Sequence, residues 1–157
     1  IFVATFIGSP QMNVLHARLE RRGEGAVLHL GTQTIGVHAD VIAARPSLLG
    51  YDGTDVGVGI RPEHLEDAAL ANSAHDTLSG TVTIREGLGA EVLLHVVLDA
   101  RVVSSDGATT TVSDKPTATV VARAAAQTTA KEDQQVTLAV DVRHLHLFDL
   151  STGLSIR

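Results

Sequence analysis

Residues 56–65 read VGVGIRPEHL. In the first five, β-branched residues alternate with glycines, which predicts a strand with one apolar face and almost no side chain on the other. A strand that is bare on one face lets another backbone or a ligand come unusually close. Arg61 precedes a proline and favours extended backbone, whereas Pro62 suits the first position of a helical turn. The stretch therefore predicts a strand that ends at a sharp corner.

The charged residues of this corner have two interpretations. Glu63 places an acid at the positive end of the predicted turn, and Arg61 stands just before that turn. Either both residues pair with neighbours and only fix the corner, or they serve a ligand or a partner. We expect the Arg61 guanidinium to be held by a carboxylate or by backbone carbonyls.

The composition favours an all-β chain. The 157 residues fit one domain or two very small ones, and they are long enough to bury a core. The chain is 44% hydrophobic but only 3% aromatic, so Val, Leu, Ile and Ala must fill the interior. A net charge of -6 argues against a nucleic-acid-binding surface.

Three further features bear on the cellular context. Cysteine is absent, so there are no disulfides and no thiolate metal sites. No apolar run approaches the roughly 20 residues that span a bilayer. The chain begins at Ile1 rather than at methionine, and we expect it to be a piece of a longer protein.

The first half reads as a short helix followed by strands and turns. Phe2 and Phe6 share one helical face, and Gly8 can end that helix. Alternating apolar residues predict strands at 15–19, 26–30 and 35–41, with a turn at 21–25 and a loop at 46–54. Residues 65–77 read as an Ala- and Asp-rich connector with a single helical turn.

The second half adds more strands. Residues 81–86 and 92–98 alternate around Gly87 and Gly89, which predicts a hairpin with a glycine-rich bend. Residues 104–115 read as a polar loop of unassigned role, 119–122 as a strand, and 136–142 as a strand whose pattern continues to 147. Residues 124–135 fit either a loop or a weak helix.

Four blocks in this order resemble one family. They are FVATFIGSPQMN at 2–13, GIRPEHL at 59–65, VTIREGLGAE at 82–91 with His95, and LHLFD at 145–149 with Thr152 and Gly153. Together they resemble the C-terminal regulatory (TOBE, OB-like) domain of the ATP-binding subunits of carbohydrate-type ABC importers, which take up maltose, trehalose or glycerol-3-phosphate. The family carries a hydrophobic residue where Arg85 stands.

The resemblance implies tandem OB-like barrels preceded by a short helix. Residues 1–12 would link the domain to a nucleotide-binding domain outside this chain, and 13–157 would form two intertwined small barrels with a seam near 66–77. The domain would regulate and dimerise the importer ATPase without doing chemistry. Its implied partners are a second copy, the permease subunits and a cytosolic regulator or small metabolite, but no nucleic acid. The implied location is cytoplasmic, at the inner face of the plasma membrane.

Catalytic motifs are absent from the sequence. No stretch matches the P-loop pattern G-x-x-x-x-G-K-[ST], so the resemblance assigns ATP and Mg²⁺ to the domain outside this chain. Leu78, Ser79 and Gly80 match the start of an ABC signature, but the next two residues do not, and we interpret the match as a coincidence. No Ser, His or Asp stands in a nucleophile-elbow context. We therefore expect no catalytic residue and no cofactor.

The eight histidines raise the question of a metal. His144 and His146 would share one face of a strand, as would His38 and Asp40. Zinc needs three or four converging ligands, and neither pair supplies them. We expect no metal site.

The candidate site residues come from the corner and from the glycine-rich bend. They are Arg61, Glu63, His64, Glu86, Gly87 and Gly89, as regulatory, dimer or ligand contacts. The alternative to the importer domain is a stand-alone oxyanion-binding barrel. In it, backbone NH groups near Gly87 and Gly89 would bind a carboxylate or phosphate with the help of Arg61 or Arg85.

Overall fold

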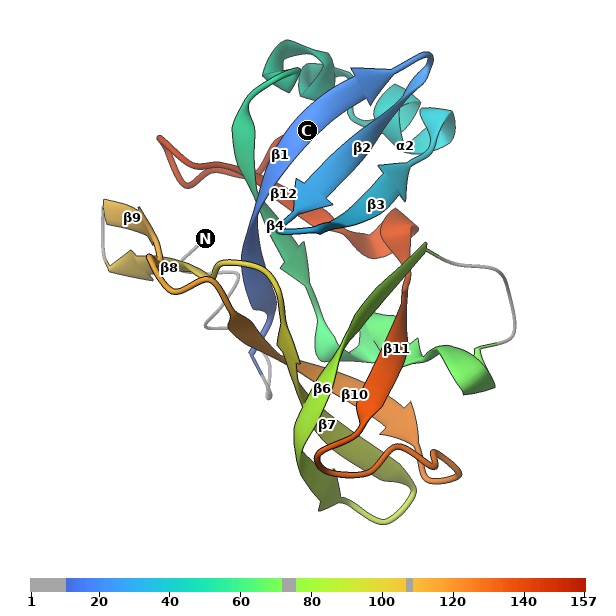
Figure 1. Cartoon of the computed structure of the whole chain (residues 1–157). Helices are drawn as coiled ribbons and strands as arrows, with labels where there is room; N and C mark the ends of the chain where they lie inside the picture. The colour runs from blue at the N-terminus through green and yellow to red at the C-terminus, as the bar shows by residue number, and fades with distance from the viewer. Residues whose placement is uncertain (1–10, 72–75, 107–108) are drawn as a thin grey trace.

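The structure is a computed structural model that describes residues 11–71, 76–106 and 109–157. It is built from two five-stranded antiparallel sheets and a two-stranded ribbon, as the sequence predicted for an all-β chain. Figure 1 shows the sheets as two curled lobes, one above the other, with the ribbon projecting to one side. No helix among the described residues is long and apolar enough to cross a membrane.

The first sheet has the strand order β12-β4-β1-β2-β3 and the second β10-β7-β6-β11-β5, while β8 pairs with β9. The strands are β1 (Asn13–Arg22), β2 (Gly25–Leu30), β3 (Gln33–Val37), β4 (Asp55–Ile60), β5 (Leu65–Asp67), β6 (Asp76–Gly87), β7 (Glu91–Leu98), β8 (Val103–Asp106), β9 (Thr109–Val112), β10 (Ala118–Ala125), β11 (Gln135–Val140) and β12 (His146–Asp149). The helical elements are α2 (Ala39–Ala44) and the 3-10 turns η1 (Pro46–Tyr51), η2 (Pro62–His64), η3 (Ala68–Leu70) and η4 (Val142–His144).

The second lobe, from β5 to β11, is continuous in the chain, whereas the first lobe combines β1–β4 with the C-terminal β12. From β4 in the first sheet, η2 carries the chain to β5 at the edge of the second sheet. From β11 in the second sheet, η4 carries it back to β12 at the edge of the first. We term residues 61–64 and 141–144 the crossing, because both passages between the lobes run through them.

The glycine-bearing face of β4 is covered by side chains. A Cβ placed on Gly59 would lie 2.8 Å from Met12 Cε and 3.0 Å from Phe148 Cε2. Both residues are buried in a small cluster outside the main core. The close approach that the alternating glycines predicted is therefore made by Met12 and by Phe148 of the neighbouring β12.

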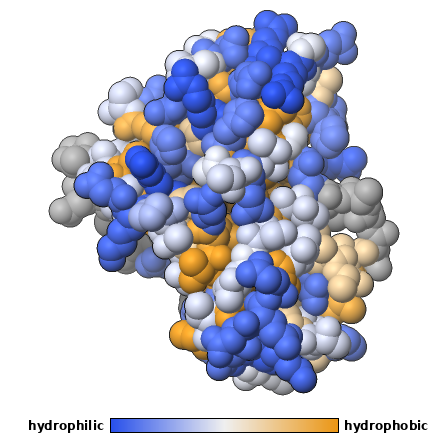
Figure 2. Space-filling view, viewed as in Figure 1, coloured by the Kyte–Doolittle hydropathy of each residue, from blue (hydrophilic) through white to orange (hydrophobic). Residues whose placement is uncertain are grey.

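The main core is aliphatic and runs through both lobes. Its members include Leu15, Leu28, Val58, Leu94 and Leu138, each 1% exposed or less. On the face in Figure 2, hydrophilic residues cover most of the surface and apolar residues appear as small patches between them.

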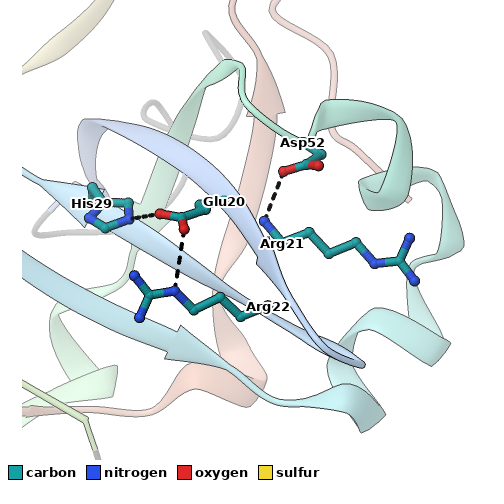
Figure 3. A network of polar contacts seen from close by, with 5 residues as sticks. All are labelled: Glu20, Arg21, Arg22, His29 and Asp52. Carbon is teal, nitrogen blue, oxygen red and sulfur yellow. Dashed lines mark hydrogen bonds and ion pairs between the residues drawn. The ribbon is translucent and has the colours of Figure 1, made fainter.

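One polar network fixes the outer end of the first sheet (Figure 3). Glu20 lies 2.7 Å from His29 Nε2 and 3.4 Å from Arg22 Nε, and the hydrogen bond from His29 is the main cause of the lowered pKa of Glu20. The Arg21 backbone N–H donates to Asp52 at 2.9 Å. These contacts join β1 to β2 and to the segment after η1.

Several local predictions were wrong. The strand at 35–41 ends at Val37, and helix α2 follows. The polar loop at 104–115 contains the paired strands β8 and β9. Residues 126–134 form a loop without a helix, which settles the open choice. The predicted N-terminal linker helix and residues 72–75 of the predicted seam lie outside the described residues.

Candidate functional site at the crossing

The corner after β4 has the predicted shape. Arg61 is extended, with φ −72° and ψ 146°, and Pro62 opens the 3-10 turn that His64 closes with an N–H bond of 2.9 Å to the Arg61 carbonyl. Glu63 is exposed to solvent, whereas Arg61 and His64 are half-buried.

The Arg61 guanidinium does not do what we expected of it. In the described part of the chain, no carboxylate or carbonyl forms a hydrogen bond or ion pair with it. Arg85 is the arginine whose guanidinium is held by backbone carbonyls. Its Nη1 donates to the Thr128 carbonyl at 3.2 Å and to the Ala130 carbonyl at 2.5 Å. Arg85 therefore fastens the 126–134 loop to β6.

A second anchor of this loop was missed by the sequence reasoning. Thr128 Oγ1 donates to Asp67 at 2.6 Å, and the other carboxylate oxygen of Asp67 accepts from the Ala69 N–H at 3.0 Å. Both Asp67 and Thr128 are buried. No local pattern indicates this pair, because its members lie in distant parts of the sequence.

Two histidines stack where the chain passages meet. The rings of His64 and His144 have centroids 4.3 Å apart and planes inclined by 15°. His144 Nδ1 lies 2.8 Å from Asp141, which also accepts from the Arg143 N–H at 3.3 Å. The two turns are thus joined by a stacked imidazole pair, and the carboxylate of Asp141 is engaged by its own turn.

Two histidines at and beside the crossing have lowered pKa values. Burial and then the nearby His144 lower the pKa of His64. Burial and then the charges of Arg61 and Arg45 lower the pKa of His146. Both imidazoles are therefore held neutral to a lower pH than a free histidine.

Some buried side-chain nitrogens lack a hydrogen-bond partner among the described residues. Arg45 Nη1 and His64 Nδ1 are buried, and neither forms a hydrogen bond within the described residues. Buried polar nitrogens are nearly always satisfied in folded proteins, so each such atom requires an explanation.

The hairpin bend has the predicted form. Gly89 adopts φ +84°, a conformation that favours glycine, and the Leu88 N–H donates to the Glu91 carbonyl at 2.8 Å. Glu86 lies 2.9 Å from His95 on the neighbouring strand. The Arg85 guanidinium is engaged by the Thr128 and Ala130 carbonyls, and no hydrogen bond in the described structure joins Arg61 or Arg85 to this bend.

The corner and the bend meet only at a shallow surface hollow of about 560 Å³. Of the six predicted site residues, Glu63 is the one that lines it, opposite Ala90 and Glu91. Glu91 pairs there with Arg123 at 3.2 Å. The other candidates remain divided between the crossing and the bend.

The histidine pairs proposed from sequence spacing do not share strand faces. His144 ends η4 and only His146 lies in β12, while His38 precedes α2 and Asp40 lies within it. Over residues 11–71, 76–106 and 109–157, no three His, Asp or Glu side chains are grouped so as to hold a metal ion.

Asp149 organises the last of the four family-like blocks, residues 145–149 with Thr152 and Gly153. Its carboxylate accepts from Ser151 Oγ at 2.6 Å, from the Ser151 and Thr152 backbone N–H groups at 2.8 and 3.0 Å, and from Tyr51 Oη at 2.6 Å. The hydrogen bond from Ser151 is the main cause of the lowered pKa of Asp149. This residue therefore holds the final turn against η1.

The lowered histidine pKa values predict that the chain loses stability in mild acid. The ordinary value is 6.5, and the folded state binds protons at His64 and His146 only below it. Since the unfolded chain binds more protons in that range, the free energy of unfolding should fall as the pH drops from about 7 to 5. Urea denaturation across this range measures the slope, and His64→Gln should make it shallower. An equal slope in that variant would contradict the assignment.

The fold defines a tandem OB-type β-barrel module in which the first barrel is completed by a strand that follows the second in sequence. Family comparison identifies it further: residues 8–65 match the MalK OB fold domain and residues 58–148 match the TOBE domain. The chain belongs to the TOBE domain family. The two matches overlap over residues 58–65, which include the first passage through the crossing.

Two of the similar relatives are import ATP-binding proteins. The sn-glycerol-3-phosphate import ATP-binding protein UgpC of Chromohalobacter salexigens is 35% identical over 94% of this chain. The trehalose import ATP-binding protein SugC of Mycobacterium tuberculosis is 33% identical over 99% of it. The chain spans only 33% and 40% of the lengths of these two relatives.

A solved structure shares the fold. The cytoplasmic molybdate-binding protein ModG matches with a TM-score of 0.53 and 12% sequence identity, over 86% of this chain and 94% of that one. At this identity the likeness concerns the fold alone.

Proposed function

We propose that the chain is the regulatory and dimerising domain of the ATP-binding subunit of an ABC importer for sugars or glycerol-3-phosphate-type substrates. The observation that carries this proposal is the order of the two family matches along one chain, MalK OB fold domain first and TOBE domain second. The named relatives that match nearly the whole chain, such as UgpC and SugC, support it.

In this proposal the chain works through contacts rather than chemistry. ATP and Mg²⁺ bind a nucleotide-binding domain outside the chain, and the permease subunits contact that domain at the cytoplasmic face of the membrane. The exposed end of the β6–β7 hairpin, where Ile84 is 47% and Leu88 55% exposed, is the apolar surface we assign to contact with a second copy. A cytosolic regulator or small metabolite biases the ATPase cycle. It does so by binding with different affinities when the nucleotide-binding domains are open and when they are closed.

The dimerising role predicts the behaviour of the full-length subunit. Deleting residues 13–157 should abolish pairing in the absence of ATP, because a two-fold contact between these domains would hold the subunits together when the nucleotide-binding domains part. Light scattering over a concentration series measures the pairing. Leu88→Asp tests the hairpin contact and should weaken pairing, whereas Leu49→Asp, a control at another exposed apolar residue, should not. If the truncated subunit pairs as well as the intact one, the role is wrong.

The non-catalytic assignment predicts that the purified chain turns over no ATP. Its sequence lacks the P-loop that cradles the phosphates, so magnesium-dependent phosphate release should stay at the buffer rate. Saturable turnover that a substitution within the chain removes would contradict the prediction.

A further inference from the structure

A side-chain amide of the first lobe pairs with a strand edge of the second. Asn13 opens β1, and its Oδ1 accepts from the Val121 N–H of β10 at 2.8 Å. Its Nδ2 donates to the Val121 carbonyl at 3.0 Å and to the Ile60 carbonyl of β4 at 2.9 Å. Because β10 is at the edge of the second sheet, this carboxamide stands where a neighbouring strand would pair.

A second carboxamide makes the same arrangement at another strand. Gln33 begins β3, the edge strand of the first sheet. Its Oε1 accepts from the Ser79 N–H at 2.7 Å, and its Nε2 donates to the Ser79 carbonyl at 2.8 Å. Ser79 lies in the part of β6 that precedes its pairing with β7, which begins at Thr81. Each carboxamide therefore forms both hydrogen bonds that a residue of an antiparallel neighbour would form.

Two carboxylates of the second lobe hold the same region of the first. Asp99, which follows β7, accepts from the Thr32 backbone N–H at 3.0 Å and from its hydroxyl at 2.6 Å. Asp76, the first residue of β6, accepts from the Gly36 N–H at 3.2 Å. We term these four pairs the inter-lobe contacts: Asn13 with Val121, Gln33 with Ser79, Thr32 with Asp99, and Gly36 with Asp76.

The inter-lobe contacts differ from the other forces that hold the lobes together. The aliphatic core runs through both lobes, but hydrophobic attraction has no preferred direction, so it favours contact without selecting one angle. The chain passes between the lobes at the crossing, through the short turns η2 and η4. Among the described residues, no strand of one five-stranded sheet pairs with a strand of the other. Hydrogen bonds depend on distance and angle, so they are the contacts that select an orientation.

We propose that Asn13 and Gln33 are positioning residues that hold the second lobe on the first in one orientation, so that the domain moves as a single body. A carboxamide suits this role because it offers a donor and an acceptor to the same backbone residue, whereas a carboxylate of equal size only accepts. The proposal does not depend on the importer function, since it rests on the contacts between the lobes.

The distance between the lobes in solution tests the proposal. The chain has no cysteine, so Glu24→Cys in the β1–β2 turn and Lys131→Cys in the 126–134 loop introduce one exposed labelling site in each lobe. Pulsed electron spin resonance then gives the distribution of distances between the two spin labels. The chain with its native inter-lobe contacts should give a single narrow distribution.

Isosteric variants remove the donors and keep the size of the side chains. Asn13→Asp combined with Gln33→Glu places a carboxylate oxygen against each carbonyl, so the distance distribution should broaden and gain a second maximum. Gln135→Glu is the matched control, because the Gln135 Nε2 donates to Thr81 Oγ1 at 2.7 Å within the second lobe. It should leave the distribution unchanged. Circular dichroism establishes that each variant is folded.

Amide hydrogen exchange tests the same contacts in the chain without the labels. If the inter-lobe contacts open as a unit, one common protection factor applies to their backbone N–H groups, those of Thr32, Gly36, Ser79 and Val121. Asn13→Ala should raise the exchange rate of the Val121 N–H about tenfold, the equivalent of losing one hydrogen bond.

The proposal is overturned if the folded double variant keeps the native distance distribution, because the apolar core then sets the orientation. It is also overturned if Gln135→Glu broadens the distribution as much as the double variant does. Should the double variant fail to fold, hydrogen exchange in the native chain decides. A common protection factor supports the proposal, and unrelated values for the four N–H groups overturn it.

Discussion

Gly80→Ala should lower the melting temperature by about 10 °C, corresponding to a loss of about 3 kcal/mol in the free energy of unfolding. Gly80 lies in β6, between β7 and β11 in the second sheet. An added Cβ would stand 2.3 Å from the Val97 carbonyl oxygen and 2.7 Å from Val96 Cγ1. The carbonyl belongs to the neighbouring strand and cannot move without disrupting the sheet. Thermal unfolding followed by circular dichroism measures the change.

Gly87→Ala is the matched control in the same strand. Nothing lies within 4 Å of the position that an added Cβ would take there, so the free energy of unfolding should change by less than about 0.5 kcal/mol. Equal melting temperatures for the two variants would show that β7 yields to the added methyl group. The close contact at Gly80 explains why glycine follows Leu78 and Ser79, independently of any ABC signature.

Arg85→Ala should cost about 2 kcal/mol of stability, the second large effect we expect. Its guanidinium donates to the carbonyls of Thr128 and Ala130, and hydrogen bonds from a charged donor contribute about 1.5–3 kcal/mol. We take a value low in that range because the residue is half-buried and water replaces part of the loss. Chemical denaturation gives the change in the free energy of unfolding.

Arg61→Ala is the control for charge and size. Its guanidinium has no hydrogen-bonded partner in the described structure, so its removal should change stability by less than about 0.5 kcal/mol in a buffer without multivalent anions. A large loss for Arg61→Ala with a small loss for Arg85→Ala would reverse the two roles. An unchanged melting temperature with altered regulation in the full-length subunit would mark Arg61 as a functional contact.

Most of the strands could be predicted from the sequence. Alternation of apolar residues predicted β1, β2, β4, β6, β7 and β11, because a half-buried strand must place every second side chain in the core. The same alternation misled at 35–41, where Ala39 and Val41 belong to a short helix instead. The strands β8 and β9 were not predicted, because they consist mostly of Ser, Thr and Asp and show no apolar alternation.

The candidate site was less predictable than the fold. The turn from Pro62 to His64 follows from local backbone preferences, and the residues themselves indicate it. The partners of Arg85 at 128 and 130, and the stacking of His64 on His144, depend on segments that only the tertiary structure brings together. Nothing in the sequence indicated that the charge of Arg45 would affect His146, which lies about a hundred residues further along the chain.

The return of β12 to the first sheet also sets the order in which the molecule can form. Gly59 in β4 pairs with His146 in β12, so the first lobe is complete only after the whole second lobe has been synthesised. The second lobe closes when Leu65 in β5, its first strand, pairs with Val140 in β11, its last. Pairings this distant in sequence slow folding, because loop closure must precede the contacts that reward it. A ribosome that has not yet reached β12 holds a first sheet that still lacks this edge strand. We therefore expect the first lobe, although it begins the chain, to be completed last, after synthesis has passed β12.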